Sequence, residues 1–552
     1  MSERLRVLLL ALVLAAAALA FHLPAWNDAW HPTWDSAVYL GLARNLADGA
    51  GYTWNGVPHL KYPPGLPLLL APFAGAPGAG VGAERALMIA SACAWMLVLF
   101  FGLRRARGNA CAFAVSLAAG LSYAVLYHTV RVLSDVPFLV PWTAALFVCE
   151  KLRREPRVST ALLFALLALS AFSLRVVSLV LVPAALLLLL PRLRASCHAR
   201  GAVLLAVLLP ALGMGAWFAR TSLLRTQIED DLRDERSYEH ELATGESYEA
   251  DAKSVGLGRA LEIAWGNLDY LRGLIGEAGS AYAFPAQSRD QVRTNEDELG
   301  WWVGLLLSAL SLALLLRLRR EHTFLLLATL AYLALVVVWP SRQGVRFLLP
   351  AFPALFLAWI DGGAALAARC GKTRALGAGA VAALLLGIAL VNALLDLTRG
   401  SAERRSWTQI YALEGARSYE GLPRQLADEG ARALREREPR ARLAADQAAY
   451  LVYRTGIAAH SFPIVARAST PAERGQLLLE KLSARGITHV SLVPEGPFAQ
   501  KDLIEPLLLA VGPAEFASRE PRAAAALQAF FAGERPAGGG ADLIVPLSAF
   551  AR

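Results

Sequence analysis

The stretch STALLFALLALSAFSLRVVSLVLVPAALLLLLP, residues 159–191, decides how this chain is organised. Its only charged residue is Arg175. A single helix of this length would extend about 50 Å at a rise of 1.5 Å per residue, whereas the hydrocarbon core of a bilayer is about 30 Å thick. We therefore predict a turn at residues 173–175, between two short membrane helices.

The composition of the whole chain is that of a membrane protein. Of its 552 residues, 56% are hydrophobic and 18% are charged, whereas soluble proteins average about 25% charged. A disordered chain, a coiled coil and an ordinary soluble enzyme are thereby excluded. The five cysteines lie in or beside apolar runs without zinc-ligand spacing, so neither a disulfide nor a metal knuckle is expected.

Eleven charge-poor segments are long enough to cross a membrane, where some crossings are short. We expect the first to be an uncleaved anchor, because no small-x-small cleavage site ends it. The segments are residues 7–23, 86–103, 110–128, 136–150, 159–174, 176–191, 201–219, 300–316, 323–339, 347–361 and 375–395.

The net charge of +9 does not indicate a nucleic-acid partner, because the basic residues are dispersed in short clusters between the apolar segments. Such clusters are typical of cytoplasmic loops. If residues 159–191 cross twice, every cluster lies inside, and the bacterial periplasm receives residues 24–85, 129–135, 220–299 and the chain after 396. The clusters are Arg104/Arg105/Arg107, Lys151/Arg153/Arg154/Arg157, Arg192/Arg194/Arg200, Arg317/Arg319/Arg320 and Arg369/Lys372/Arg374.

Three of the predicted periplasmic segments are long enough to have their own structure. Residues 24–85 contain a predicted helix over 35–46 and a turn-rich loop over 55–65. Residues 220–299 form either a solvated connector or a mobile cover over a substrate groove. Residues 401–552 predict a soluble α/β domain, with strands at 443–445, 488–493 and 543–547 and helices at 448–453 and 470–485.

Two acidic residues begin helices at the predicted outer membrane surface, Asp35 and Asp135. Either carboxylate has a structural alternative as a helix N-cap. Placing a charged side chain beside a membrane span costs free energy, however, so such residues often have a function. A carboxylate at this level can accept a proton from a hydroxyl group.

Four arginines are predicted at the same level, although outer loops are usually poor in basic residues. The alternative is that each guanidinium merely reaches the lipid headgroups. Together they would bind a lipid phosphate and stabilise the charge that develops on it during group transfer. They are Arg131, Arg175, Arg342 and Arg346.

The motifs WDSAVYLGLAR (34–44), GAGY (49–52) and KYPPGLP (61–67) resemble the first outer loop of GT-C glycosyltransferases. SDVP (134–137) and RFLLP (346–350) are similar to further family signatures. The nearest group is the protein-mannosyltransferase and aminoarabinose-transferase superfamily, including the branch of bacterial lipopolysaccharide galacturonosyltransferases. The resemblance covers residues 1–400 and implies a GT-C bundle, here of about eleven membrane helices, followed by the periplasmic α/β domain.

The resemblance also implies roles for individual residues. Asp35 matches the essential acidic residue of the first loop, and Asp135 matches a second acidic position that in relatives orders the acceptor or a metal. Lys61 is near the family's phosphate-binding lysine, but stands two residues ahead of the Pro-Pro pair rather than next to it. Ser36 replaces the second acid of protein mannosyltransferases, which disfavours a protein acceptor.

We therefore predict an inverting transferase that moves a sugar from a polyprenyl-phosphate donor to an envelope glycolipid or glycan. No cofactor is required; a divalent metal, if used, would bind Asp35 and Asp135. The rival hypotheses are a transporter or flippase of lipid-linked sugars, a membrane-anchored glycan-binding protein, and a glycan ligase or polymerase. The predicted site comprises the catalytic Asp35 and Asp135, the phosphate-binding Arg175, Arg346, Lys61, Arg131 and Arg342, and the groove residues Tyr39, Tyr62 and His59.

Overall fold

A computed structural model describes most of the chain. The described residues are 2–26, 33–194, 196–225, 238, 256–280, 309–315, 322–339, 344–402, 422–446, 448–462, 470–493, 504–532 and 534–550. Of the predicted site residues, Arg342 lies outside them.

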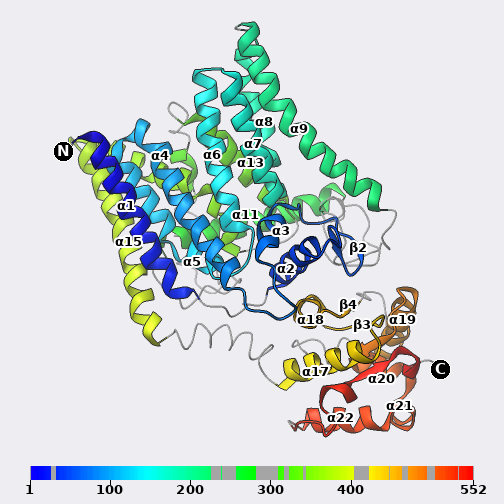
Figure 1. The fold of residues 1–552 in the computed structure, drawn as a ribbon. Coiled ribbons are helices and arrows are strands. Elements are labelled where there is room, and N and C mark those ends of the chain that lie inside the picture. The colour runs from blue at the N-terminus through cyan, green and yellow to red at the C-terminus, as the bar shows by residue number, and fades with distance from the viewer. Residues whose placement is uncertain are drawn as a thin grey trace.

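Helices dominate the first 400 residues, and most of them run roughly side by side in one bundle (Figure 1). The chain is a polytopic membrane protein that is mainly α-helical. The α-helices are α1 (Glu3–His22), α2 (Trp34–Ala47), α3 (Gly65–Leu70), α4 (Gly82–Gly120), α5 (Tyr123–Thr129), α6 (Asp135–Arg154), α7 (Val158–Leu174), α8 (Leu181–Leu189), α9 (Cys197–Arg225), α11 (Leu257–Ser280), α13 (Thr323–Val338), α14 (Phe352–Arg369) and α15 (Arg374–Ala402).

Short 3₁₀ turns and one hairpin connect these helices. The turns are η1 (Leu23–Ala25), η2 (Ala71–Phe73), η3 (Val176–Val180), η4 (Leu190–Arg194), η8 (Gly344–Phe347) and η9 (Leu349–Ala351). The hairpin pairs β1 (Thr53–Trp54) with β2 (Val57–Pro58) in antiparallel register, and it lies within the first loop. Asn55 and Gly56 both have positive φ in its turn, as a two-residue hairpin loop requires.

The predicted apolar segments that lie within the described residues all coincide with helices. Five described stretches are long and apolar enough to cross a membrane, and three shorter apolar helices accompany them. Segment 300–316 lies mostly outside the described residues, so the number of eleven crossings stays a prediction. The five are Glu3–His22, Gly82–Gly120, Val176–Arg194, Cys197–Arg225 and Leu349–Arg369.

The turn predicted within residues 159–191 is present. Helix α7 ends at Leu174, and Arg175 has an extended backbone with φ −148° and ψ 127°. The 3₁₀ turn η3 and helix α8 follow. Arg175 is therefore at the end of one apolar helix and the start of the next.

Residues 422–550, here termed the C-terminal part, form a small α/β unit around a four-stranded sheet. Its strand order is β4-β3-β5-β6, in which β4, β3 and β5 are parallel and β6 is antiparallel. The strands are β3 (Arg442–Ala444), β4 (Ala458–His460), β5 (His489–Ser491) and β6 (Ile544–Pro546). The helices are α17 (Leu422–Arg437), α18 (Ala448–Thr455), α19 (Pro471–Ala484), α20 (Glu505–Val511), α21 (Pro513–Arg519) and α22 (Pro521–Phe531), with 3₁₀ turns η11 (Gly539–Leu543) and η12 (Leu547–Phe550).

Two hydrophobic cores organise the molecule. The larger one joins the membrane helices to α2 and α3, and the smaller one fills the C-terminal part. In Figure 1 the C-terminal part lies at the end of the bundle where α2 and α3 also lie. The domain boundary at residue 400 stays a prediction.

Candidate active site

Asp35 is held at the start of helix α2 with its carboxylate directed into a pocket. Thr33 is the N-cap, and it forms a reciprocal capping box with Ser36. Asp35 is therefore not the cap, which removes the structural alternative for this residue. Its side chain, 25% exposed, is available to other groups.

Two donors hold the Asp35 carboxylate. The Tyr62 hydroxyl donates to Oδ1 over 2.7 Å, and both terminal nitrogens of Arg346 donate to Oδ2 over 3.2 Å. Although burial alone would lower the pKa of Arg346, the carboxylates of Asp135 and Asp35 raise it above its ordinary value. Arg346 therefore remains a cation beside Asp35 at any relevant pH.

Other residues of the first loop hold the backbone of Tyr62 in place. Nε2 of His59 accepts a hydrogen bond from the Tyr62 backbone N–H over 3.0 Å, and the two rings stack with centroids 5.3 Å apart. The Tyr52 hydroxyl donates to the Tyr62 carbonyl over 2.7 Å. Burial, with smaller effects of Lys61 and Arg220, lowers the pKa of His59 to about 3, so its imidazole is neutral and serves as an acceptor.

Asp135 and Arg175 form a second, more deeply buried ion pair in the same region. Asp135 is the first residue of α6 and only 2% of its side chain is exposed. Ser134 is the N-cap, so the cap alternative is wrong for Asp135 as well. Because Arg175 separates α7 from η3, this pair joins the ends of two membrane helices.

A pocket connects the groups around Asp35 and Arg175. It holds about 420 Å³ of space, including its open mouth. Cations, a carboxylate, hydroxyls and aromatic rings meet there. Its lining residues are Asp35, Tyr39, Ser134, Leu174, Arg175, Val176, Val177, Tyr238, Trp339, Arg346 and Phe347.

The structure brings four of the predicted site residues into the lining of this pocket: Asp35, Tyr39, Arg175 and Arg346. Tyr39 also shares a hydrogen bond with Ser134, whose hydroxyl lies 3.2 Å from its own.

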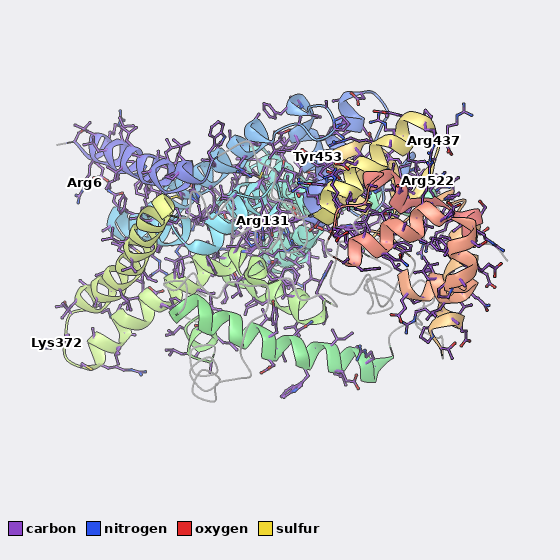
Figure 2. All side chains as sticks on the ribbon, turned by 90° about the horizontal axis from the view of Figure 1, so that it is seen from below. Arg6, Arg131, Lys372, Arg437, Tyr453 and Arg522 are labelled. Carbon is purple, nitrogen blue, oxygen red and sulfur yellow. The ribbon has the colours of Figure 1, made fainter. Side chains whose placement is uncertain are left out.

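The other described site residues lie behind the pocket or beside it. Asp135 pairs with Arg175, and Tyr62 bonds Asp35. Neither Tyr62 nor His59 is among the residues that line this pocket, and both are buried, so their place in a substrate groove stays a prediction. The Lys61 ammonium lies 5.9 Å from the centroid of the Tyr62 ring. Seen from below in Figure 2, Arg131 projects onto the middle of the bundle.

Among the pocket residues that sequence reasoning missed as site candidates, three have side chains that can form hydrogen bonds: Ser134, Tyr238 and Trp339. Ser134 stands inside the quoted SDVP motif, so its position signalled it. Tyr238 belongs to residues 220–299, most of which lie outside the described residues, so the choice between a connector and a cover stays open. Trp339 ends an apolar helix, where nothing in the pattern distinguishes it from an interfacial aromatic residue.

The acidic residues do not fit a divalent metal site. Hard divalent cations take several oxygen ligands, whereas each of these carboxylates already pairs with an arginine. Within the described residues, no group of three His, Cys, Asp or Glu side chains is arranged to hold a metal ion. We therefore derive no step through a metal.

The arrangement of the chain resembles solved membrane proteins. A structure of the archaeal oligosaccharyltransferase AglB from Archaeoglobus fulgidus, with an inhibitory peptide and a dolichol phosphate, matches with a TM-score of 0.50. The match has 11% identity and covers 93% of this chain and 72% of that one.

The chain has the GT-C membrane fold. ArnT from Cupriavidus metallidurans, solved bound to undecaprenyl phosphate, aligns over 83% of this chain and 85% of its own, with a TM-score of 0.45 and 14% identity. No protein-family model and no curated protein matches the sequence. The pocket of this chain lies where the first loop, the starts of α6 and η3, and the turn before α14 meet.

Proposed function

We propose that this protein is an inverting glycosyltransferase that uses a polyprenyl-phosphate sugar as donor. The observation that carries the proposal is the pocket itself, in which Asp35 lies 3.2 Å from Arg346 and Arg175 is also part of the lining. The acceptor is a hydroxyl of an envelope glycolipid or glycan. The site faces the periplasm of a bacterial inner membrane.

The reaction requires one base and cations to receive a phosphate. The acceptor oxygen attacks the anomeric carbon from the face opposite the phosphate, and the anomeric C–O bond to phosphate breaks. Asp35 takes the hydroxyl proton. The polyprenyl phosphate leaves as an anion, whose charge Arg346 and Arg175 stabilise.

The two carboxylates have different environments and therefore different proposed roles. Asp35 reaches the pocket and can contact an acceptor hydroxyl. Asp135 is almost fully buried and bound to Arg175, so we assign it the task of orienting that guanidinium. Arg131 and Lys61 stay second candidates for phosphate contacts, since neither lines the pocket that the described residues form.

The solved neighbours support a lipid-phosphate substrate without identifying the sugar. ArnT was solved with undecaprenyl phosphate and AglB with a dolichol phosphate. The proposed donor has the same chemistry, a long isoprenoid with an anionic head. Apolar helices provide the lipid-facing surface such a donor needs.

The test uses the product that every such donor releases. Purified protein in detergent is given undecaprenyl-phosphoryl glucose, galactose, mannose, galacturonic acid or 4-amino-4-deoxyarabinose, with an extract of envelope glycolipids. We expect undecaprenyl phosphate to be released with at least one donor, and a sugar to disappear from the glycolipids of cells without the gene.

The rival functions predict different results. A transporter or flippase moves the lipid-linked sugar across vesicles without releasing undecaprenyl phosphate. Translocation without release, or release that is independent of Asp35, would overturn the proposed transfer reaction.

A further inference from the structure

Helix α18 of the C-terminal part is buried between the two hydrophobic cores. Ala448 and Leu451 belong to the core of the C-terminal part, whereas Ala449, Tyr450 and Tyr453 belong to the core of the membrane helices. Residues three or four apart share a helix face, so α18 presents one face to each core. This short helix therefore joins the core of the membrane helices to the core of the C-terminal part, and we call it the joint.

This joint is anchored firmly to the C-terminal part. Arg454 of α18 forms a buried ion pair with Asp428 of α17, in which Nε lies 2.8 and 2.9 Å from the two carboxylate oxygens. Arg435, also on α17, donates to the Thr455 carbonyl over 2.5 Å. These bonds connect α18 to α17 and so to the rest of the C-terminal part.

The other face of α18 packs on α2, the helix that carries Asp35; α18 lies directly below α2 in Figure 1. At the beginning of α2, Trp34 packs against both cores, and its ring centroid lies 6.3 Å from that of Tyr450. Trp34 is the residue immediately before Asp35. Tyr450 therefore contacts the residue that directly precedes the proposed base in the chain.

A second set of contacts holds the far end of α2. The Arg44 guanidinium lies 5.3 Å from the centroid of the Tyr453 ring and donates to the Tyr453 carbonyl over 3.4 Å. It also donates to the Gly75 carbonyl over 2.9 Å. Figure 2 shows Tyr453 between the bundle and the C-terminal part.

The loop at residues 75–79 closes around the same tyrosine. The Tyr453 hydroxyl donates to the Ala79 carbonyl over 3.1 Å, and the Gly78 N–H donates to the Tyr453 carbonyl over 3.2 Å. Gly78 has φ +75°, and a Cβ there would lie 3.1 Å from the Arg454 carbonyl oxygen. This close approach and the positive φ both favour glycine.

We propose that the C-terminal part positions the proposed base: Tyr450 and Tyr453 of α18 hold both ends of α2 and thereby keep Asp35 in register with Arg346. The two tyrosines are positioning residues, because they act through α2 and not on the substrate. This role rests on the proposed transferase function. A displacement of about 1 Å at a reacting group is enough to cost about a hundredfold in rate.

The contacts predict a specific kinetic signature. Arg346 and Arg175 come from η8 and from the end of α7, not from α2. Loosening α2 should therefore lower kcat and leave donor binding intact. We expect Tyr450→Ala and Tyr453→Ala each to lower kcat about tenfold, with the donor KM and the affinity for undecaprenyl phosphate unchanged.

Two controls separate positioning from folding. Tyr453→Phe keeps the ring over Arg44 and loses only the hydroxyl bond to Ala79, so we expect kcat within about twofold of the wild type. Phe531→Ala removes an exposed ring on α22 of the same C-terminal part and should have no effect.

A double-mutant cycle tests whether the effect passes through Asp35. If it does, Tyr453→Ala should lower kcat less than twofold in an Asp35→Glu background, because coupled residues are not additive. Full additivity would overturn the proposal, as would wild-type kcat in both alanine variants.

A readout independent of activity distinguishes this inference from the proposed function. We expect hydrogen exchange of the α2 amides, residues 38–47, to accelerate about tenfold in Tyr453→Ala, while exchange in α13 stays unchanged. Absence of turnover with every donor would refute the transferase function alone. Unchanged exchange in α2 would refute the positioning role, whatever the reaction is.

Discussion

The two carboxylates of the pocket region differ in what surrounds them, and this difference assigns their roles. Asp35 is partly exposed to the pocket, where a tyrosine and an arginine hold it without covering it. Asp135 is buried against Arg175. Removing one partner of a buried ion pair lowers the stability of the protein by several kcal/mol, because the other charge is left buried and unpaired. The proposed base is therefore Asp35, while Asp135 secures a cation.

Asp35→Asn should lower turnover by a factor of about 100 to 10,000, the usual contribution of a general base. The amide keeps the shape of the side chain, its oxygen can accept from Arg346 and its NH2 can donate to the Tyr62 oxygen, so the protein should insert and fold. The measurement is release of undecaprenyl phosphate by purified protein. Asp48→Asn, at the exposed far end of the same helix, is the control; retained turnover in Asp35→Asn would remove Asp35 from the mechanism.

Arg346→Lys should weaken donor use, because a lysine replaces two guanidinium nitrogens with one point charge. We expect the donor KM to rise about tenfold, and Arg346→Ala to raise it further, through lost charge-assisted hydrogen bonds to phosphate. Inhibition by undecaprenyl phosphate should weaken in parallel. Arg259→Ala, which removes an exposed arginine of α11, is the control, and an unchanged donor affinity in both Arg346 variants would refute the phosphate role.

At the residue scale, the sequence predicted the charged groups better than the rest of the pocket. Asp35, Arg175 and Arg346 stood out because charge at the end of an apolar segment needs a reason. Tyr238 and Trp339 did not, because aromatic residues are ordinary near membrane surfaces. Their place in the lining depends on how distant segments meet, which one sequence does not encode locally.

Helix α2 shows how the extent of an element can be predicted closely while its cap is left open. The apolar spacing and the glycines at 49 and 51 predicted its extent within about one residue. Gly49, with φ 75°, does end the helix, since its N–H donates to the Leu46 carbonyl and the next N–H to the Asn45 carbonyl. Thr33, however, is the better cap, because its backbone is extended and Ser36 completes the box.

Strand β4 was the one element of the sheet that the sequence did not predict. Its residues, Ala458–His460, include no β-branched or aromatic residue of the kind that favours strands. It forms because β3 lies beside it in parallel register, Leu443 opposite Ala459. Tertiary pairing thus determines this element, whereas the Thr470 cap and Pro471 defined α19 from the sequence alone.

Helix α4 contains a turn that depends on a single glycine. Gly108 has φ 76° and ψ 165° within the helix and separates the two apolar segments predicted at 86–103 and 110–128. Only glycine adopts this backbone region readily. Gly108→Ala should therefore destabilise the protein by about 1–3 kcal/mol.

The melting temperature in detergent measures this effect. Gly215→Ala is a matched control, because Gly215 lies inside α9 with open space around its Cα, and alanine favours a helix. Equal melting temperatures for the two variants would show that the turn at Gly108 tolerates a side chain.

On the scale of the whole molecule, buried neutral histidines are spread from the first loop to the C-terminal part. Burial is the largest cause that lowers the pKa of His59 and of His460 to about 3, and that of His322, beside Arg107, to about 4. In the unfolded chain each would titrate near 6.5. The unfolded state therefore binds these protons first as the pH falls.

This difference fixes the sign of the pH dependence. Above about pH 6.5 the three histidines make their full contribution to the free energy of unfolding. As the pH falls from there towards 4 and 3, each histidine loses about 1.4 kcal/mol of that contribution per pH unit. We expect the melting temperature in detergent to fall steeply between pH 6.5 and 5. His59→Gln, which retains an acceptor for the Tyr62 N–H, should make that fall shallower, whereas His198→Gln, at an exposed position in α9, should not. A melting temperature that is constant from pH 7 to 5 would mean that these rings gain their protons without opening the structure around them.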